Sequence, residues 1–241
     1  MLSALYHNIL YQPLFNILVF FYDIIPVKDV GWSIILLTVV IRLLLFPLSK
    51  SSIESQKKLQ DIKPELDALK EKHKDDKEAF GKATMALYKE KKINPASSCL
   101  PLLIQLPILF AVYQVLRVGL SNGSFDLLYS FVSHPGVINS LFLGFINLAE
   151  PNIVLAILAG LGQYFQSKMI IKTQPEKNNK ASGKADLAGA MSKQMLYFMP
   201  IFTVFIGMSL PSGLALYWLV SILLTILQQY LVLRKTKVTQ V

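Results

Sequence analysis

The sequence predicts an all-α polytopic membrane protein with five transmembrane helices, an outer interfacial N-terminal helix and a cytoplasmic helical hairpin. Of its 241 residues, 53% are hydrophobic and only 16% are charged, and the mean hydropathy is +0.47. An average soluble chain carries roughly 25% charged residues, so too few polar side chains remain here to cover a water-soluble globule. The lengths of the apolar stretches and the placement of the positive charges support the same fold class.

Five apolar stretches have about the length that crosses a membrane. A helix needs roughly 20 residues, with a usable range of about 17–25, to cross the hydrocarbon core. The fourth stretch has 16 residues. At about 1.5 Å per residue it covers only ~24 Å, so it requires local thinning of the bilayer. The predicted transmembrane segments are residues 30–48, 99–118, 153–170, 195–210 and 213–233.

Positive charge predicts the order of these crossings. Of the 24 Lys and Arg residues, 12 lie in residues 50–92, six in residues 168–193 and three in the tail, residues 234–241. Residues 1–31 and 119–152 carry almost none. Because cytoplasmic loops are enriched in Lys and Arg, the N-terminus and the 119–152 loop are predicted outside, and the C-terminal tail in the cytoplasm.

The N-terminal segment, residues 1–29, is predicted to lie on the outer side of the membrane. Its apolar stretch, residues 14–25, has only 12 residues, contains Asn16 and Asp23, and is bracketed by prolines. Because this stretch is too short to span, it is predicted to form a helix in the outer interface. A sixth, short crossing is the alternative.

Residues 49–94 are highly charged but carry two apolar seams at helical spacing, which predict an antiparallel helical hairpin in the cytoplasm. A polar turn at residues 73–76 separates them, and Pro64 marks a helix start or a kink. A disordered charged linker is the alternative. Residues 171–194, by contrast, are rich in turn formers and are predicted to form a flexible cytoplasmic loop. The seams are Leu59, Ile62, Leu66 and Leu69, then Phe80, Ala83 and Leu87.

Arg42 is the candidate functional charge, since it lies inside the first predicted span. An arginine at the centre of a transmembrane helix costs about 2.5–3.5 kcal/mol on insertion scales. Snorkelling of the side chain to the cytoplasmic headgroups would lower that cost and is the alternative. Against it, Thr38 lies one turn away on the same face, which indicates a polar stripe facing the protein interior.

Other predicted spans carry matching polar positions. Polar groups facing lipid would be unsatisfied, so these stripes are predicted to converge with Arg42 on one wet cavity that opens inward. Ordinary hydrogen bonds between helices, worth about 0.6 kcal/mol each, are the alternative. No acidic residue lies within a span, so Arg42 is predicted to be available to a foreign carboxylate. The positions are Ser98 and Gln105 on the second span, Gln163 and Gln166 on the third, and Trp218, Ser221, Thr225 and Gln228 on the fifth.

The sequence predicts no catalytic residue, no metal site and no cofactor. The three histidines stand alone and fall on both predicted sides of the membrane. Cys99, the single cysteine, has no histidine nearby and is interpreted as a packing residue. No phosphate-binding loop of the GxxxxGK[ST] type is present. The net charge of +9 is explained by the cytoplasmic segments, so no specific nucleic-acid partner is predicted.

Four segments in order resemble the YidC family of membrane-protein insertases, within the Oxa-type superfamily. The match runs over nearly the whole chain, from about residue 10 to residue 233. The segments are residues 37–48 (LTVVIRLLLFPL), residues 99–108 (CLPLLIQLPI) with Asn94-Pro95 before them and Tyr113 after, residues 165–169 (FQSKM), and residues 210–218 (LPSGLALYW) with Gln228-Gln229.

The resemblance implies a five-helix core around a hydrophilic groove that opens to cytoplasm and lipid and is closed outside. In this family an arginine matching Arg42 receives acidic residues of a client's translocated tail. Gln105, Gln166 and Trp218 match groove-lining positions, with Gln163 beside them. The hairpin of residues 50–92 corresponds to a region linked to client capture. The large extracytoplasmic domain and the long basic tail of some members are expected to be absent.

We therefore predict an insertase and chaperone of the bacterial cell membrane rather than an enzyme. The candidate groove residues are Arg42, Thr38, Gln105, Gln163, Gln166, Trp218 and Ser221. The expected partners are nascent membrane proteins and the lipid bilayer, and the resemblance adds the Sec translocon, the ribosome and the signal-recognition pathway. A small-anion transporter or channel that uses the same arginine is the alternative function.

Overall fold

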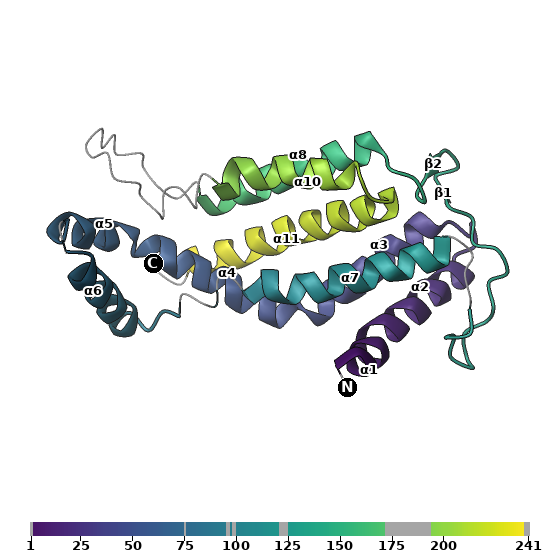
Figure 1. Ribbon diagram of the computed structural model, residues 1–241, viewed down its shortest axis with the longest axis horizontal. Helices are drawn as coiled ribbons and strands as arrows, with labels where there is room; N and C mark the ends of the chain where they lie inside the picture. Colours follow the sequence, from purple (N-terminus) through teal and green to yellow (C-terminus); the bar gives the residue numbers. More distant parts are fainter. Residues whose placement is uncertain are drawn as a thin grey trace.

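Helices make up most of the regular structure in the computed structural model of this chain, which describes residues 2–74, 76–94, 97, 100–120, 125–171 and 194–238. Figure 1 shows the elements in sequence colours. They are α1 (Leu2–Tyr6), π-helix η1 (His7–Tyr11), α2 (Gln12–Ile24), α3 (Val30–Leu44), α4 (Phe46–Asp61), α5 (Lys63–Lys72), α6 (Lys77–Glu90), α7 (Leu100–Leu120), β1 (Leu141–Phe142), β2 (Ile146–Asn147), α8 (Ile153–Ile171), π-helix η3 (Gln194–Phe198), α10 (Met199–Gly207) and α11 (Ser212–Val238).

Helix α11 is the centre of the bundle. It lies between the α8/α10 pair and the α3/α7 layer, with α2 packed on the far side of that layer (Figure 1). Small residues bring α8 and α10 close together: a Cβ placed on Gly160 would lie 2.3 Å from Val204 Cγ2. Such close approach of small residues favours helix association in lipid, where the hydrophobic effect does not drive it.

Two described helices are by themselves long and apolar enough to cross a membrane, α7 over Leu103–Leu120 and α11 over Ser212–Arg234. A third candidate is α3 with α4, which are bent by 66° at the break between them. The first predicted span, residues 30–48, is therefore too long as one straight helix, because α3 ends at Leu44. Pro47 lies in the first turn of α4 and has no N–H to continue the helix.

The remaining predicted spans have shifted bounds. Helix α8 covers residues 153–170 as expected, while the 195–210 segment begins as a π-helix and ends in α10 at Gly207. Helix α11 is longer than the predicted 213–233 span and runs to Val238. Cys99, Ser98, residues 172–193 of the predicted flexible loop and the last residues of the tail lie outside the described residues.

The N-terminal helix is longer than the apolar stretch at residues 14–25. The cap residues between α1, η1 and α2 all keep helical backbone angles, so the helical run begins at Leu2 and continues to Ile24. Asn16, which indicated an interfacial helix, is only 2% exposed. Its amide donates to Leu127 O at 2.9 Å and accepts from Tyr129 N at 2.6 Å. This polar residue therefore fastens α2 to the loop between α7 and α8.

That loop, predicted over residues 119–152, contains a small hairpin in its described part. Strands β1 and β2 pair antiparallel through Phe142 and Ile146. Leu143 and Gly144 both have positive φ, 54° and 82°, as the tight turn between the strands requires. Asp29 Oδ2 accepts the Leu143 N–H at 2.8 Å, and its Oδ1 caps α3 at Gly31 N. One carboxylate therefore joins the start of α3 to the hairpin.

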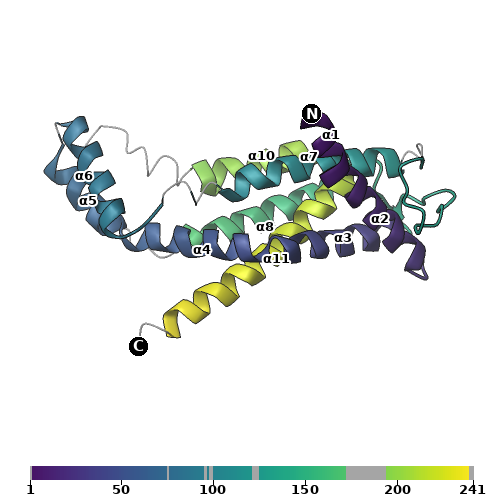
Figure 2. The same cartoon turned by 90° about the horizontal axis from the view of Figure 1, so that it is seen from below.

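Helices α5 and α6 stand at the opposite end of the molecule from β1 and β2 in both views (Figures 1 and 2). Asp76 caps α6, and Pro64 lies in the first turn of α5 rather than at a kink. Lys91 forms an ion pair with Glu65 at 2.9 Å, and this bond raises the pKa of Lys91. The two helices share a small core of Ile62, Leu87 and Ile93, with Leu59, Leu66, Leu69 and Tyr88 packed against it.

Candidate functional site

Arg42 on α3 points toward α11 and bonds to Ser221. Its Nε donates to Ser221 Oγ at 2.7 Å, and Nη2 donates to the same oxygen. Ser221 is 1% exposed and lies in the middle of the most central helix. The guanidinium therefore meets a neutral partner on the central helix.

The charge of Arg42 is not neutralised by the described part of the chain. Among the described residues, no carboxylate lies within ion-pair distance of Arg42. Ser221 Oγ takes two of the guanidinium N–H groups, and the group carries further donors. A positive charge in this low-dielectric setting attracts an anion more strongly than it would in water.

A small pocket adjoins the guanidinium. Its volume is about 30 Å³, which is room for about one water molecule. Apolar side chains supply most of its wall, and the polar groups are Arg42, Gln105 and Ser49. The lining residues come from α3, the bend after it, α4 and α7: Arg42, Leu45, Leu48, Ser49, Ile104 and Gln105. Arg42 and Ser49 of the first predicted span and Gln105 of the second therefore lie beside the same pocket.

Gln105 closes the pocket toward α11 through Tyr217. Its Nε2 donates to the Tyr217 hydroxyl at 2.9 Å. Tyr217 is fully buried and lies one helical turn before Ser221. Tyr217 was not among the site residues predicted from the sequence. Its spacing from Ser221 was the available signal, because residues i and i+4 share a helix face.

Thr38 lies beside the site without contributing a free donor. The side chain is completely buried, and its hydroxyl donates to Ile34 O of its own helix at 2.6 Å. Trp218 is half-buried on α11, one turn before Ser221. Neither residue lines the pocket next to Arg42.

Gln163 and Gln166 lie on α8, which packs on the other side of α11. Gly162 marks the contact, since a Cβ there would lie 3.1 Å from Ile222 Cγ2. Both glutamines are half-buried, and in the described part of the chain no hydrogen bond joins either of them to Arg42 or Gln105. The structure brings together Arg42, Gln105 and Ser221, and it leaves the α8 pair apart.

The polar side chains along one face of α11 form hydrogen bonds with three different kinds of partner. Ser221 accepts from Arg42, Thr225 donates to the Ser221 carbonyl of its own helix, and Gln228 Nε2 donates to Phe46 O at 3.1 Å. The last bond joins α11 to the first residue of α4. Within the described residues, no group of three or more His, Cys, Asp or Glu side chains could hold a metal ion.

These features define a class: helical membrane proteins with a half-buried arginine that has no carboxylate partner in the described structure and borders a small pocket. The family described as "60Kd inner membrane protein" matches residues 20–239. The membrane protein insertase YidC of Fusobacterium nucleatum subsp. nucleatum is 35% identical over 209 residues, covering 87% of this chain and 88% of that protein. The chain therefore belongs to the YidC family of inner membrane proteins, as its motifs indicated.

Longer relatives match as well. The membrane protein insertase YidC of Nitratidesulfovibrio vulgaris (strain DSM 19637 / Miyazaki F) is 35% identical over 229 residues, which cover 95% of this chain but 39% of that protein. A solved structure described as an active YidC insertase with its first transmembrane domain resolved superposes with a TM-score of 0.59 at 26% identity. The match covers 92% of this chain and 46% of that one. This chain thus spans less than half the length of these longer relatives.

Proposed function

We propose that this chain is a membrane-protein insertase and chaperone, acting alone or with the Sec translocon. It inserts integral membrane proteins and helps them fold through a hydrophilic, inward-open groove with Arg42 as its charge. The observation that carries this proposal is the environment of the Arg42 guanidinium. The guanidinium is held by the neutral Ser221 and borders a pocket with Gln105.

The chemistry of this site suits an acidic polar tail. Two unit charges about 4 Å apart attract by roughly 4 kcal/mol at an effective dielectric constant of ~20. A client carboxylate beside Arg42 recovers part of the cost of leaving water. The client's apolar segment then partitions sideways into lipid, which supplies the driving force through hydrophobic transfer. No covalent step is required.

The pocket must widen to receive a client, because its present volume of about 30 Å³ admits only about one water molecule. The Gln105–Tyr217 bond joins α7 to α11 across the site. We propose that breaking the Gln105–Tyr217 hydrogen bond lets α7 separate from α11. The proposed groove then extends from Arg42, Gln105 and Ser221 to the other candidate positions, Thr38, Trp218, Gln163 and Gln166.

We place the N-terminus outside and the C-terminus in the cytoplasm, with five crossings formed by α3 with the start of α4, α7, α8, η3 with α10, and α11. The charge pattern supports this topology. Nine of the 12 lysines of residues 50–92 lie in α4, α5 and α6, and α5 and α6 stand at the opposite end of the molecule from β1 and β2 (Figure 1). Helix α2 lies in the outer interface, and the bacterial inner membrane is the location.

The proposed partners are nascent membrane proteins, lipids, the Sec translocon, the ribosome and components of the signal-recognition pathway. The α5/α6 hairpin is the contact surface that we assign to the cytoplasmic partners. Its lysines are largely exposed, as at Lys82 and Lys74. Residues 63–92 carry nine Lys against seven Asp or Glu, and this positive excess favours anionic partners.

An insertion assay with matched variants tests the role of Arg42. The client is a single-span protein with an acidic N-terminal tail, and a client with a neutralised tail is the reference. A net preference of about 1–2 kcal/mol corresponds to a factor of roughly 5–30. Arg42→Ala should lower insertion of the acidic client by that factor and spare the neutral one.

Two further variants complete the test. Arg42→Lys should keep most of the insertion activity because it keeps the positive charge. Arg117 is an exposed arginine at the end of α7, and Arg117→Ala should insert both clients as well as the parent does. Equal insertion of the acidic client by the parent and Arg42→Ala would remove the proposed role. A small-anion flux through vesicles that disappears in Arg42→Ala would favour the transporter alternative.

A further inference from the structure

The loop between α7 and α8 has the composition of a membrane-embedded surface. Residues 127–149 contain no Asp, Glu, Lys or Arg, although loops that face water normally carry charged side chains. Its large apolar side chains point outward: Phe131 is 74% exposed and Phe145 is 75% exposed. A contiguous exposed apolar surface on a folded protein marks a contact with another apolar phase.

This loop is held firmly enough to present those side chains. Polar side chains of the N-terminal region accept its backbone N–H groups at three places. Asn16 binds Tyr129 N at 2.6 Å, the Tyr22 hydroxyl binds Asn139 N at 3.0 Å, and Asp29 binds Leu143 N at 2.8 Å. Because these bonds satisfy part of the loop backbone from the protein side, the loop can approach an apolar phase at lower cost.

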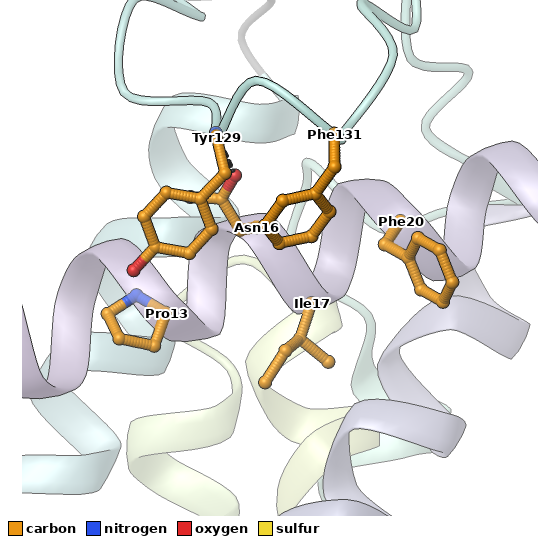
Figure 3. A pocket seen from close by; sticks show the side chains of 6 residues that line it. All are labelled: Pro13, Asn16, Ile17, Phe20, Tyr129 and Phe131. Carbon is orange, nitrogen blue, oxygen red and sulfur yellow. Dashed lines mark hydrogen bonds between the residues drawn. The ribbon is translucent and has the colours of Figure 1, made fainter.

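A pocket between the loop and α2 shows which apolar phase fits. In Figure 3 the rings of Tyr129 and Phe131 stand over α2, and Asn16 turns toward the Tyr129 backbone. The pocket has a volume of about 230 Å³. An apolar cavity of about 150 Å³ stays dry and accepts a hydrocarbon such as benzene, so this one has room for a stretch of acyl chain. Its walls are Pro13, Asn16, Ile17, Phe20, Tyr129 and Phe131.

The pocket continues an apolar surface that already faces outward on the neighbouring helices. On α2, Phe20 is 42% exposed and Ile24 is 55% exposed. Trp32, at the start of α3, is 46% exposed and packs edge-on against Phe142 of β1. Tryptophan is enriched where hydrocarbon meets headgroups. The loop, α2 and the start of α3 lie at the same end of the molecule (Figure 1), and each exposes large apolar side chains.

We propose that this loop is a lipid-binding anchor that lies at the boundary between headgroups and acyl chains. An acyl chain of that leaflet occupies the pocket between α2 and Phe131, and the turn between β1 and β2 inserts Leu143 and Phe145. The anchor fixes the ends of α7 and α8 at a defined depth. Its function is separate from client binding, since none of its residues borders Arg42.

Site-specific fluorescence in vesicles tests the anchor. Single cysteines replace Phe131, Leu143 or Phe145 in full-length protein that carries Cys99→Ala. Each is labelled with an environment-sensitive dye in phosphatidylcholine–phosphatidylglycerol vesicles, with or without lipids that carry a quencher near the headgroup. Lys82→Cys is the matched control because its side chain is 77% exposed on α6, at the other end of the molecule.

The anchor predicts a blue-shifted emission at all three loop positions and loss of most of that emission with the quenching lipids. The Lys82→Cys dye should keep its emission with these lipids and lose it with aqueous iodide. Leu143→Cys and Phe145→Cys probe the same turn, so one of them suffices if the other does not fold. Loop dyes that behave as the Lys82→Cys dye, with parental circular dichroism, would overturn the proposal.

Discussion

Replacing Ser221 with alanine removes the acceptor that holds the Arg42 guanidinium. Two N–H groups lose their partner, one of them at 2.7 Å. A hydrogen bond to a charged group is worth about 1.5–3 kcal/mol when nothing replaces it. The neighbouring pocket of about 30 Å³ can hold about one water, which would take over part of the bond. We therefore expect Ser221→Ala to lower the free energy of unfolding by only about 0.5–1.5 kcal/mol.

Reversible unfolding in mixed micelles, with a denaturing detergent as the titrant, measures this difference. Thr225→Val is the matched control, because within the described part of the chain the Thr225 hydroxyl bonds to the carbonyl one turn earlier on α11 and to no other group. Such a back-bond adds little to helix stability, so the control should change the free energy by less than about 0.5 kcal/mol. A loss above roughly 3 kcal/mol for Ser221→Ala would mean a dry pocket. A loss no larger than that of the control would mean that Ser221 does not hold Arg42.

Three further predictions concern contacts away from the Arg42 site. Asp29→Ala should destabilise the protein by about 2–4 kcal/mol in the same assay, because it removes a helix cap and a charged hydrogen bond to the hairpin turn. Gly31→Ala should cost about 1–3 kcal/mol, since its Cβ would lie 2.0 Å from the Phe142 ring; an unchanged stability would refute that packing. The pKa of Lys91 is raised by Glu65. Its stabilisation of the α5/α6 pair should therefore be complete below the ordinary lysine pKa of about 10.4 and be lost as pH rises through the higher folded-state pKa. Circular dichroism between neutral and strongly alkaline pH should detect this loss in the parent and a smaller one in Glu65→Gln.

Patterns in the sequence predicted the features that depend on local spacing. The helical character of the apolar stretches follows from their composition. Leu59, Ile62, Leu66 and Leu69 share a helix face by their spacing; Ile62 belongs to the small core of the α5/α6 pair, and the other three pack against it. Ser221 was selected from a polar stripe of i, i+3 and i+7 positions, and it is the residue that binds Arg42.

Features that depend on distant partners were not predictable in this way. Asn16 looked like a residue facing the interface, yet its partners lie more than 100 residues away in the chain. Gln228 belonged to the same stripe as Ser221, but it bonds to the carbonyl of Phe46 at the break after α3. That break ends α3 at Leu44 inside the first predicted span, and Pro47 was a local signal for it. The spacing of residues in the sequence predicts the helix face on which a polar side chain lies. It does not predict the group with which that side chain forms a hydrogen bond.

The accessibility of the Arg42 pocket from the cytoplasm tests the central claim most directly. Leu45 lines the pocket, while its neighbour Leu44 is 74% exposed on the outside of the bundle. Each is replaced by cysteine in a Cys99→Ala background and treated with a membrane-impermeant maleimide, added to inverted vesicles or to the outside of spheroplasts. A wet inward-open pocket predicts that Leu45→Cys reacts only in inverted vesicles and that Leu44→Cys reacts in neither. Reaction of Leu45→Cys from the outside, or no faster reaction than that of Leu44→Cys in inverted vesicles, would contradict it.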